Sequence, residues 1–246
     1  MDKYGLIGYP LSHSFSKGFF NNKFESEKLD AEYINFEIPS ISEFKALIAG
    51  NPELKGLNVT IPYKEQVIKY LDDVDDAVKE IGAVNVIKFI RVKNKLKLKG
   101  YNSDVIGFSD SIAPILNENN KNALILGTGG AAKAVAYAFK KLGITYKYVA
   151  RTPKKGQFAY TDLDEKIIGE YPIVVNSTPL GMFPNVDEAP DIPYQYLTSN
   201  HLLYDLLYNP DVTKFMKLGK ERGASVKNGL EMLLLQAFAS WNIWNE

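Results

Sequence analysis

The 246-residue chain contains no cysteine and only two histidines, His13 and His201. The absence of cysteine excludes disulfide bonds, thiolate metal sites and a cysteine nucleophile. Because the two histidines lie far apart in the sequence, we expect no histidine-based metal site.

The sequence also lacks an excess of either charge and a long apolar run. Its 29 basic and 29 acidic side chains give a formal net charge of zero, without the basic footprint of a nucleic-acid-binding protein. No stretch approaches the roughly 18 apolar residues of a membrane helix. The first ten residues, MDKYGLIGYP, do not form a signal peptide. We therefore expect a cytoplasmic protein with no nucleic-acid or membrane partner. The sequence leaves monomer and homodimer open.

Hydrophobic residues make up 46% of the chain, which is enough for one large core or two of ordinary size. Strand-like and helix-like segments alternate, which predicts an α/β fold. In the first part we expect strands at 4–8, 31–38 and 57–60, helices at 16–28, 41–49, 63–71 and 74–80, and a hairpin of 83–90 with 95–101. In the second part we expect a helix at 103–116, strands at 122–126, 146–150, 172–176 and 201–206, and a helix opening within 127–134.

The last predicted helix, 230–243, is apolar nearly all round, which is typical of a buried helix. Gln236 is the polar exception in its middle. It is either a functional side chain or one that simply hydrogen-bonds a neighbouring backbone group.

A glycine-rich turn, GTGGAAKA, joins the predicted strand 122–126 to a helix. Gly127 permits a tight turn, Gly129 lets the backbone approach a pyrophosphate, and Ala132 lets the helix pack close to the strand. The N–H groups at the helix N-terminus can then receive the anion. The alternative is a glycine-rich turn without a ligand.

The next predicted strand ends in Ala150 and Arg151, followed by Lys154 and Lys155, and no acidic residue stands there. A free ribose 2′-hydroxyl favours an acidic partner, whereas a 2′-phosphate favours arginine and lysine. The sequence therefore predicts NADP rather than NAD. Arg151 could also be an ordinary surface charge.

Polar residues cluster where other predicted strands end, which is where open α/β sheets bind ligands. These residues are Ser14, Ser16, Thr60, Lys64, Asn85, Asn102 and Asp104. Such hydroxyls, amides and one lysine suit a small polyhydroxylated acid. Each also has a simpler explanation: Ser16 and Asp104 could be helix N-caps, and Lys64 a solvated charge in a first helical turn.

Nine ordered segments of the chain resemble the shikimate dehydrogenase family. They are GYPLSHSFS (8–16), NVTIPYK (58–64), GAVNV (82–86), YNSD (101–104), GTGGAA (127–132), ART (150–152), NSTPLGM (176–182), YDLLYNP (204–210) and NGLEMLLLQA (228–237). NVTIPYK and NSD are the most specific of these. The resemblance implies NADPH-dependent reduction of 3-dehydroshikimate to shikimate, in the biosynthesis of aromatic amino acids.

The resemblance also implies two domains. Residues 1–101, completed by 224–246, would form an α/β domain for substrate binding and catalysis, and 102–223 a Rossmann-like NADP-binding domain. The expected catalytic pair is Lys64 and Asp104. The expected substrate ligands are Ser14, Ser16, Thr60, Asn85, Tyr208 and Gln236. The expected cofactor-binding residues are Gly127, Gly129, Gly130, Ala131, Ala132, Arg151, Thr152, Lys155, Thr178 and Gly229.

In this reading an ammonium at Lys64 stabilises the charge that hydride transfer leaves on the ketone oxygen, and it delivers the proton. Asp104 would hold Lys64 and favour its charged form. Pro62 would occupy the first position of the helix from which the lysine emerges. No metal is needed.

The chain departs from the usual family pattern at Lys17, Asn21, Ala150 and Lys155. Two related alternatives stay open, a dual quinate/shikimate dehydrogenase and a non-catalytic member that binds shikimate-like ligands. A Rossmann enzyme acting on folates or amino acids fits the serine pair and NVTIPYK poorly.

Overall fold

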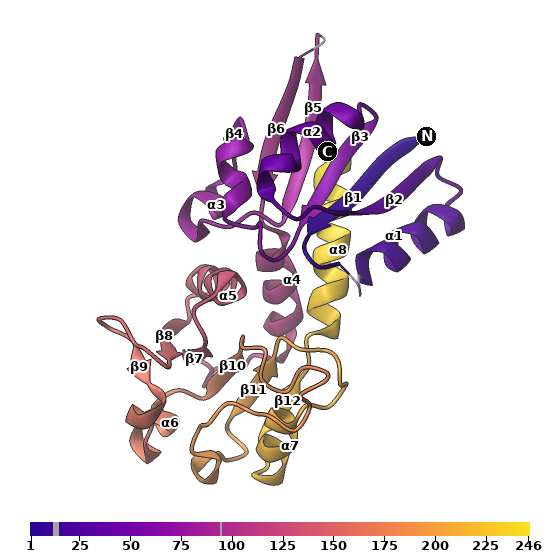
Figure 1. Ribbon diagram of the computed structural model, residues 1–246. Coiled ribbons are helices and arrows are strands. Elements are labelled where there is room, and N and C mark those ends of the chain that lie inside the picture. Colours follow the sequence, from indigo (N-terminus) through magenta and orange to yellow (C-terminus); the bar gives the residue numbers. More distant parts are fainter. Residues whose placement is uncertain (12–14, 94) are drawn as a thin grey trace. The chain divides into compact units, whose positions relative to one another are not determined.

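The structure is a computed structural model of the chain and describes residues 1–11, 15–93 and 95–246. These residues form two compact units, 1–103 with 237–246, and 104–236 (Figure 1). Each unit contains a six-stranded sheet, and the expected α/β class is confirmed. The boundary within the last helix differs from the expected one. Residues 224–236 group with the second unit, because Met232 packs in its core, whereas Trp244 packs in the core of the first.

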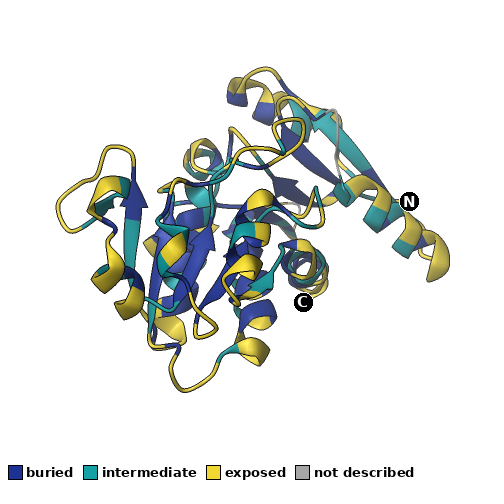
Figure 2. Cartoon of the chain, turned by 90° about the horizontal axis from the view of Figure 1, so that it is seen from below, coloured by how far each residue is buried: buried dark blue, intermediate teal, exposed yellow. Residues whose placement is uncertain are grey.

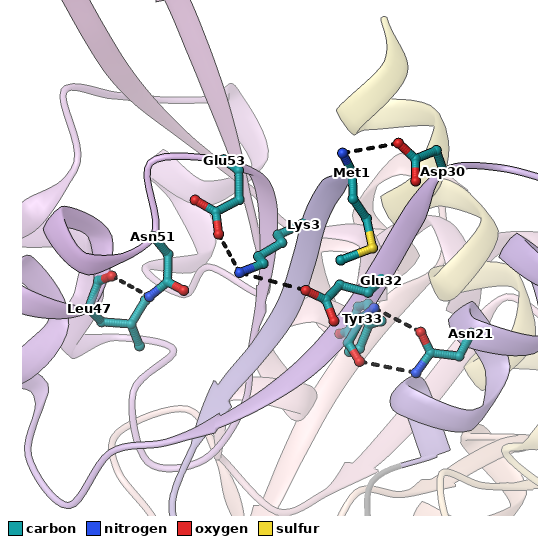
Figure 3. A network of polar contacts seen from close by, with 9 residues as sticks. All are labelled: Met1, Lys3, Asn21, Asp30, Glu32, Tyr33, Leu47, Asn51 and Glu53. Carbon is teal, nitrogen blue, oxygen red and sulfur yellow. Dashed lines mark hydrogen bonds and ion pairs between the residues drawn. The ribbon is translucent and has the colours of Figure 1, made fainter.

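The sheet of the first unit has the order β2-β1-β3-β5-β6-β4. Its first three strands are parallel, and β5 and β6 form an antiparallel hairpin next to β3. The strand bounds are β1 Asp2–Gly8, β2 Ala31–Glu37, β3 Leu54–Val59, β4 Asp73–Val74, β5 Val86–Val92 and β6 Lys95–Tyr101. Lys3 of β1 forms ion pairs with Glu32 and Glu53, which link it to β2 and to the residue before β3 (Figure 3).

Both faces of this sheet are buried. Alternation along β1 sends Ile7 to one face, where it joins Phe44 and Leu57, and Leu6 to the other. The helices of this unit are α1 Phe15–Ser26, α2 Phe44–Gly50 and α3 Asp76–Ile81, with 3₁₀ helices η1 Ile41–Glu43 and η2 Gln66–Tyr70. The second half of α8 (Leu230–Asn245) covers the face that contains Leu6.

The helix expected at 63–71 is wrong in its first part. Residues 61–65 form turns, and the helical segment is only the short η2. The Tyr63 N–H donates to Thr60 O at 2.9 Å, and the Val84 N–H donates to Lys64 O at 2.8 Å. Lys64 O therefore accepts its hydrogen bond from the segment before β5 and not from a residue of the same helix. Pro62 is not the first residue of a helix.

The sheet of the second unit is wholly parallel, in the order β12-β11-β10-β7-β8-β9. The chain runs outward from β7 to β9 and then returns to β10 on the other side of β7, which is the doubly wound Rossmann arrangement. The strand bounds are β7 Asn122–Leu126, β8 Thr145–Ala150, β9 Phe158–Ala159, β10 Ile173–Asn176, β11 Leu202–Asp205 and β12 Ser225–Lys227.

Helices cover both faces of this second sheet. One face packs on α4 (Ser103–Ile112), α5 (Gly130–Lys141) and Met232 of α8, and the other on α6 (Glu165–Glu170) and α7 (Lys214–Glu221). Figure 2 shows the central strands buried, while the helices have exposed outer faces. Three 3₁₀ helices complete the unit: η3 Ala113–Ile115, η4 Tyr160–Asp162 and η5 Tyr194–Tyr196.

Several elements of the second unit were not predicted, namely β9, α6, α7 and β12, and the helix expected at 103–116 ends as an α-helix at Ile112. Pro114 explains that end, because it lacks the N–H that an α-helix needs there. The last helix is less buried than expected, since Leu230 and Phe238 are exposed. Among the described residues, no helix is long and apolar enough to cross a membrane.

Asp205, at the end of β11, is a fully buried carboxylate. It accepts hydrogen bonds from Thr213 Oγ1 at 2.6 Å, from Asn176 Nδ2 at 3.0 Å and from the Leu207 N–H at 3.1 Å. Burial outweighs these bonds and raises the pKa of Asp205 to about 6. The folded protein therefore binds this proton more tightly than the unfolded chain.

This pKa shift predicts a pH-dependent contribution to stability. Because the pKa rises on folding, this contribution to the free energy of unfolding is largest below pH 4 and is lost as the pH rises to about 6. At about 1.4 kcal/mol per pKa unit, the loss amounts to about 3 kcal/mol. The variant Asp205→Asn should lack this loss. Urea unfolding between pH 4 and 7 measures it, with Asp110→Asn, at an exposed position, as the control. Parallel curves for Asp205→Asn and the unchanged protein would contradict this assignment.

Candidate cofactor and substrate sites

A pocket of about 660 Å³ lies in the second unit beyond the carboxyl ends of β7, β8 and β10. It includes the point where the strand order reverses between β7 and β10, which is where doubly wound sheets bind ligands. The lining residues are Gly127, Thr128, Gly129, Val149, Ala150, Arg151, Ala159, Tyr160, Thr161, Ser177, Thr178, Pro179, Leu180, Ala189 and Asp191.

The glycine-rich turn lines this pocket. Gly127 has a φ of +105°, and a Cβ on it would lie 2.9 Å from Ser177 Oγ, so only glycine fits without strain. Gly129 is the N-cap of α5 and has an ordinary φ of −75°. A Cβ there would meet nothing within 4 Å, so the space in front of it is open. The first-turn N–H groups of α5 follow directly, which is the arrangement that receives a phosphate.

The neighbouring strand β10 supplies a second wall. Asn176 is fully buried, and its Oδ1 accepts hydrogen bonds from both the N–H and the Oγ1 of Thr178, at 3.0 and 2.7 Å. Thr178 Oγ1 in turn accepts from the Leu180 N–H at 3.3 Å. These bonds fix the turn after β10, and Thr178 lies beside Gly127 in the pocket lining. The role of Thr178 in cofactor binding stays a prediction.

The pocket lining carries charges of both signs. Arg151 follows β8 and lies near Tyr160, where its charge partly offsets the rise in the Tyr160 pKa that burial causes. Asp191 also lines the pocket, although no acidic residue stands at the end of β8. It comes from the long segment between β10 and β11, so sequence order gave no signal that it belongs here. Thr128 and Tyr160 were likewise missed.

The other expected cofactor residues are not among the described residues that line this pocket. Gly130, Ala131 and Ala132 form the first turn of α5. Thr152 and Lys155 lie exposed in the turn between β8 and β9.

Gly229, just before α8, is buried, and a Cβ there would lie 2.1 Å from Leu206 O. Glycine is therefore required at this position for packing, and a role for Gly229 beside a cofactor stays a prediction.

In the first unit the expected substrate ligands follow neighbouring strands. Ser14 lies outside the described residues, whereas Ser16 is in the first turn of α1. Thr60 follows β3, and its N–H donates to Ile7 O at 2.9 Å. Asn85 is buried immediately before β5, not within a strand as expected.

The expected catalytic pair is divided between the two units. Lys64 is half-buried in the turns after β3, and Asp104 lies in the first turn of α4 and belongs to the second unit. Tyr208, which is 40% exposed, and Gln236, whose Nε2 donates to Leu233 O at 2.9 Å, also belong to the second unit. The pairing of Lys64 with Asp104 and the roles of Tyr208 and Gln236 therefore stay predictions. No group of histidines and acidic residues in the described part of the chain could hold a metal ion.

Residues 6–87 match the family model of the shikimate dehydrogenase substrate binding domain. A relative from Clostridium beijerinckii named shikimate dehydrogenase (NADP(+)) is 40% identical over 266 aligned residues, which cover 100% of this chain and 93% of the relative. This chain belongs to the shikimate dehydrogenase family.

Two solved structures extend the likeness to the fold. The crystal structure of shikimate dehydrogenase from Aquifex aeolicus has a TM-score of 0.86 and 36% identity, and the match covers 100% of this chain and 92% of that one. Shikimate 5-dehydrogenase from Thermus thermophilus, in complex with NADP(H) and shikimate, has a TM-score of 0.86 and 28% identity, with 99% and 93% covered. The resemblance drawn from the nine sequence segments is confirmed.

The two glycines of the turn should respond differently to alanine. Gly127→Ala forces an L-residue to a φ of +105° and should destabilise the fold by about 1–3 kcal/mol. Gly129→Ala meets no atom and should leave the melting temperature nearly unchanged, yet weaken dinucleotide binding by roughly tenfold, or about 1.4 kcal/mol. Calorimetric titration and thermal melts separate the two effects. If Gly129→Ala binds the dinucleotide normally, the turn does not hold its phosphates.

Proposed function

We propose that the protein is an NADP-dependent oxidoreductase that catalyses the reversible reduction of 3-dehydroshikimate to shikimate, in aromatic amino acid biosynthesis. The observation that carries this proposal is the similarity to relatives named shikimate dehydrogenase (NADP(+)) over nearly the whole length of both chains. We also propose that it acts in the cytoplasm, as a monomer or homodimer. The first unit would bind the substrate and the second the cofactor.

The pocket of the second unit supports the choice of NADP. Its volume, the tight turn at Gly127, the open space at Gly129 and the start of α5 fit a dinucleotide phosphate. Arg151 in the pocket lining provides a cation for a 2′-phosphate, with Thr152 and Lys155 in the turn that follows. Asp191 in the same lining is a feature that would suit a free ribose hydroxyl, so a direct comparison of NADP with NAD is needed.

The polar residues of the first unit support the choice of substrate. Ser14 and Ser16 would hold the substrate carboxylate, and Thr60 and Asn85 its ring hydroxyls, assisted by Tyr208 and Gln236 from the second unit. Hydroxyl and amide groups discriminate well at such a site, because a substrate that lacks a matching hydroxyl leaves a buried polar group unpaired.

Chemistry at the ketone requires a proton donor. Bound NADPH would supply the hydride to the ketone carbon, which leaves negative charge on the oxygen. The Lys64 ammonium would stabilise that charge and transfer a proton to the oxygen, and Asp104 would hold the lysine in place. In the reverse direction neutral Lys64 would accept the hydroxyl proton of shikimate.

The direct test mixes purified protein with shikimate and NADP and follows the absorbance of NADPH. Parallel reactions replace shikimate with quinate and NADP with NAD. We expect rapid reduction with shikimate and NADP, and slower reduction in each of the other combinations. Equal KM values for NADP and NAD would defeat the 2′-phosphate argument. Measurable shikimate binding with no reduction in any combination would favour a non-catalytic member of the family.

The variant Lys64→Ala tests the proton donor. Its kcat should fall on the order of 100-fold or more, the typical contribution of general acid–base catalysis, while the dissociation constant for shikimate changes far less. Lys69→Ala is the matched control, since Lys69 is an exposed lysine only five residues away, over the ring of Tyr70. Near-normal turnover of Lys64→Ala would assign Lys64 to the ordinary surface lysines.

A further inference from the structure

A continuous chain of hydrogen bonds runs through the interior of the first unit. It begins near the start of α1, crosses the sheet at β2 and β3, and reaches the residues around the start of β5 by way of α8. Its members are Ser16, Tyr33, Asn58, Ser240, Ser103 and Asn85. All except Ser16 are at least nine-tenths buried. The two ends of the chain, Ser16 and Asn85, are residues to which we assign substrate contacts.

Tyr33 of β2 holds the first end. Asn21 of α1 clamps its backbone, because Asn21 Oδ1 accepts from the Tyr33 N–H at 2.8 Å and Asn21 Nδ2 donates to Tyr33 O at 3.1 Å (Figure 3). The Tyr33 hydroxyl donates to Asn58 Oδ1 at 2.7 Å and also shares a hydrogen bond with Ser16. Burial raises the pKa of Tyr33 well above its ordinary value, so the hydroxyl keeps its proton and remains a donor.

Asn58 of β3 forms the middle of the chain. Both hydrogens of its Nδ2 are used, one toward Asn85 O at 3.2 Å and one toward Ser240 Oγ at 3.0 Å. The amide can therefore adopt only one orientation, with Oδ1 facing Tyr33. Ser240 lies on α8, 182 residues further along the chain, and its side chain is fully buried.

Asn85 forms the second end. The Ser103 N–H, which can only donate, points at Asn85 Oδ1 at 2.7 Å. Asn85 Nδ2 donates to Ser103 Oγ at 3.0 Å, and Ser103 Oγ meets Ser240 Oγ at 3.1 Å. The contacts with Ser103 thus define which side of the Asn85 amide carries the donor that a substrate oxygen would need.

From these contacts we infer that Ser240 is a positioning residue for substrate recognition, which fixes Asn85 through Ser103 and Ser16 through Asn58 and Tyr33. The inference rests on the proposed function, since it concerns the same substrate. Loss of the Ser240 hydroxyl removes the acceptor of a buried Asn58 N–H and a partner of Ser103. The Asn58 amide and the Ser103 hydroxyl can then shift, and Asn85, which bonds to both residues, shifts with them.

The test uses two variants and two matched controls. Ser240→Ala and Tyr33→Phe each delete one buried hydroxyl of the chain. Ser111→Ala and Tyr204→Phe delete the same groups from a helix serine and a strand tyrosine of the second unit, which bond to each other at 2.6 Å and are equally buried. All four variants lose one buried hydroxyl, so a general loss of stability should affect both pairs.

We expect Ser240→Ala and Tyr33→Phe to raise the KM for shikimate roughly fivefold or more, with the KM for NADP unchanged. The controls should lower the melting temperature without a change in the KM for shikimate. An unchanged KM in both test variants, or an equal rise in the controls, would overturn the inference. If Ser240→Ala does not fold, Tyr33→Phe decides alone from the other end of the chain of bonds.

The unchanged protein separates this inference from the proposed function. If it neither reduces NADP with shikimate nor binds shikimate in calorimetric titration, the proposed function fails and the inference fails with it. If it is active and only the predicted difference between the variant pairs is missing, the proposed function stands and Ser240 has a structural role alone.

Discussion

The first unit depends on the packing of Trp244 against Gly56. A Cβ at residue 56 would lie 2.3 Å from the indole ring, so β3 must carry glycine there for the last helix to lie on the sheet. The indole Nε1–H then donates to Ile87 O at 3.1 Å, and the ring contacts Tyr4 and Phe20. This contact brings the last ten residues of the chain into a unit that is otherwise built from the first 103.

The same helix brings Ser240 to the middle of the sheet. This helix contributes in two ways. Its buried aromatic side chain, Trp244, belongs to the core of the first unit, whereas the Ser240 hydroxyl accepts a hydrogen bond from the Asn58 amide and contacts Ser103. The proposed substrate-binding residues therefore depend on a segment far away in sequence. The glycine-rich turn of the second unit differs, because it is built from residues adjacent in sequence: Gly127, Gly129 and the start of α5.

Much of both sheets could be predicted from the sequence, because alternation and apolar runs are local signals. The strands around residues 4–8, 31–38 and 122–126 were found within a few residues of their true bounds. Predictions failed where a distant partner decides the conformation. The Val84 N–H donates to Lys64 O, and the residues around Lys64 form turns where a helix was expected. The two-residue β9 is a strand only because it pairs with β8.

The sequence by itself determined the family, the α/β class and the glycine turn, since these rest on residue types at short spacings. Only the tertiary structure decided which residues meet across long separations. It brought Asp191 into the same pocket as Arg151, and it joined Asn58 to Ser240. The physical reason is that a hydrogen bond or a pocket wall requires atoms within a few ångströms, and the sheet order, which no local pattern encodes, determines those neighbours.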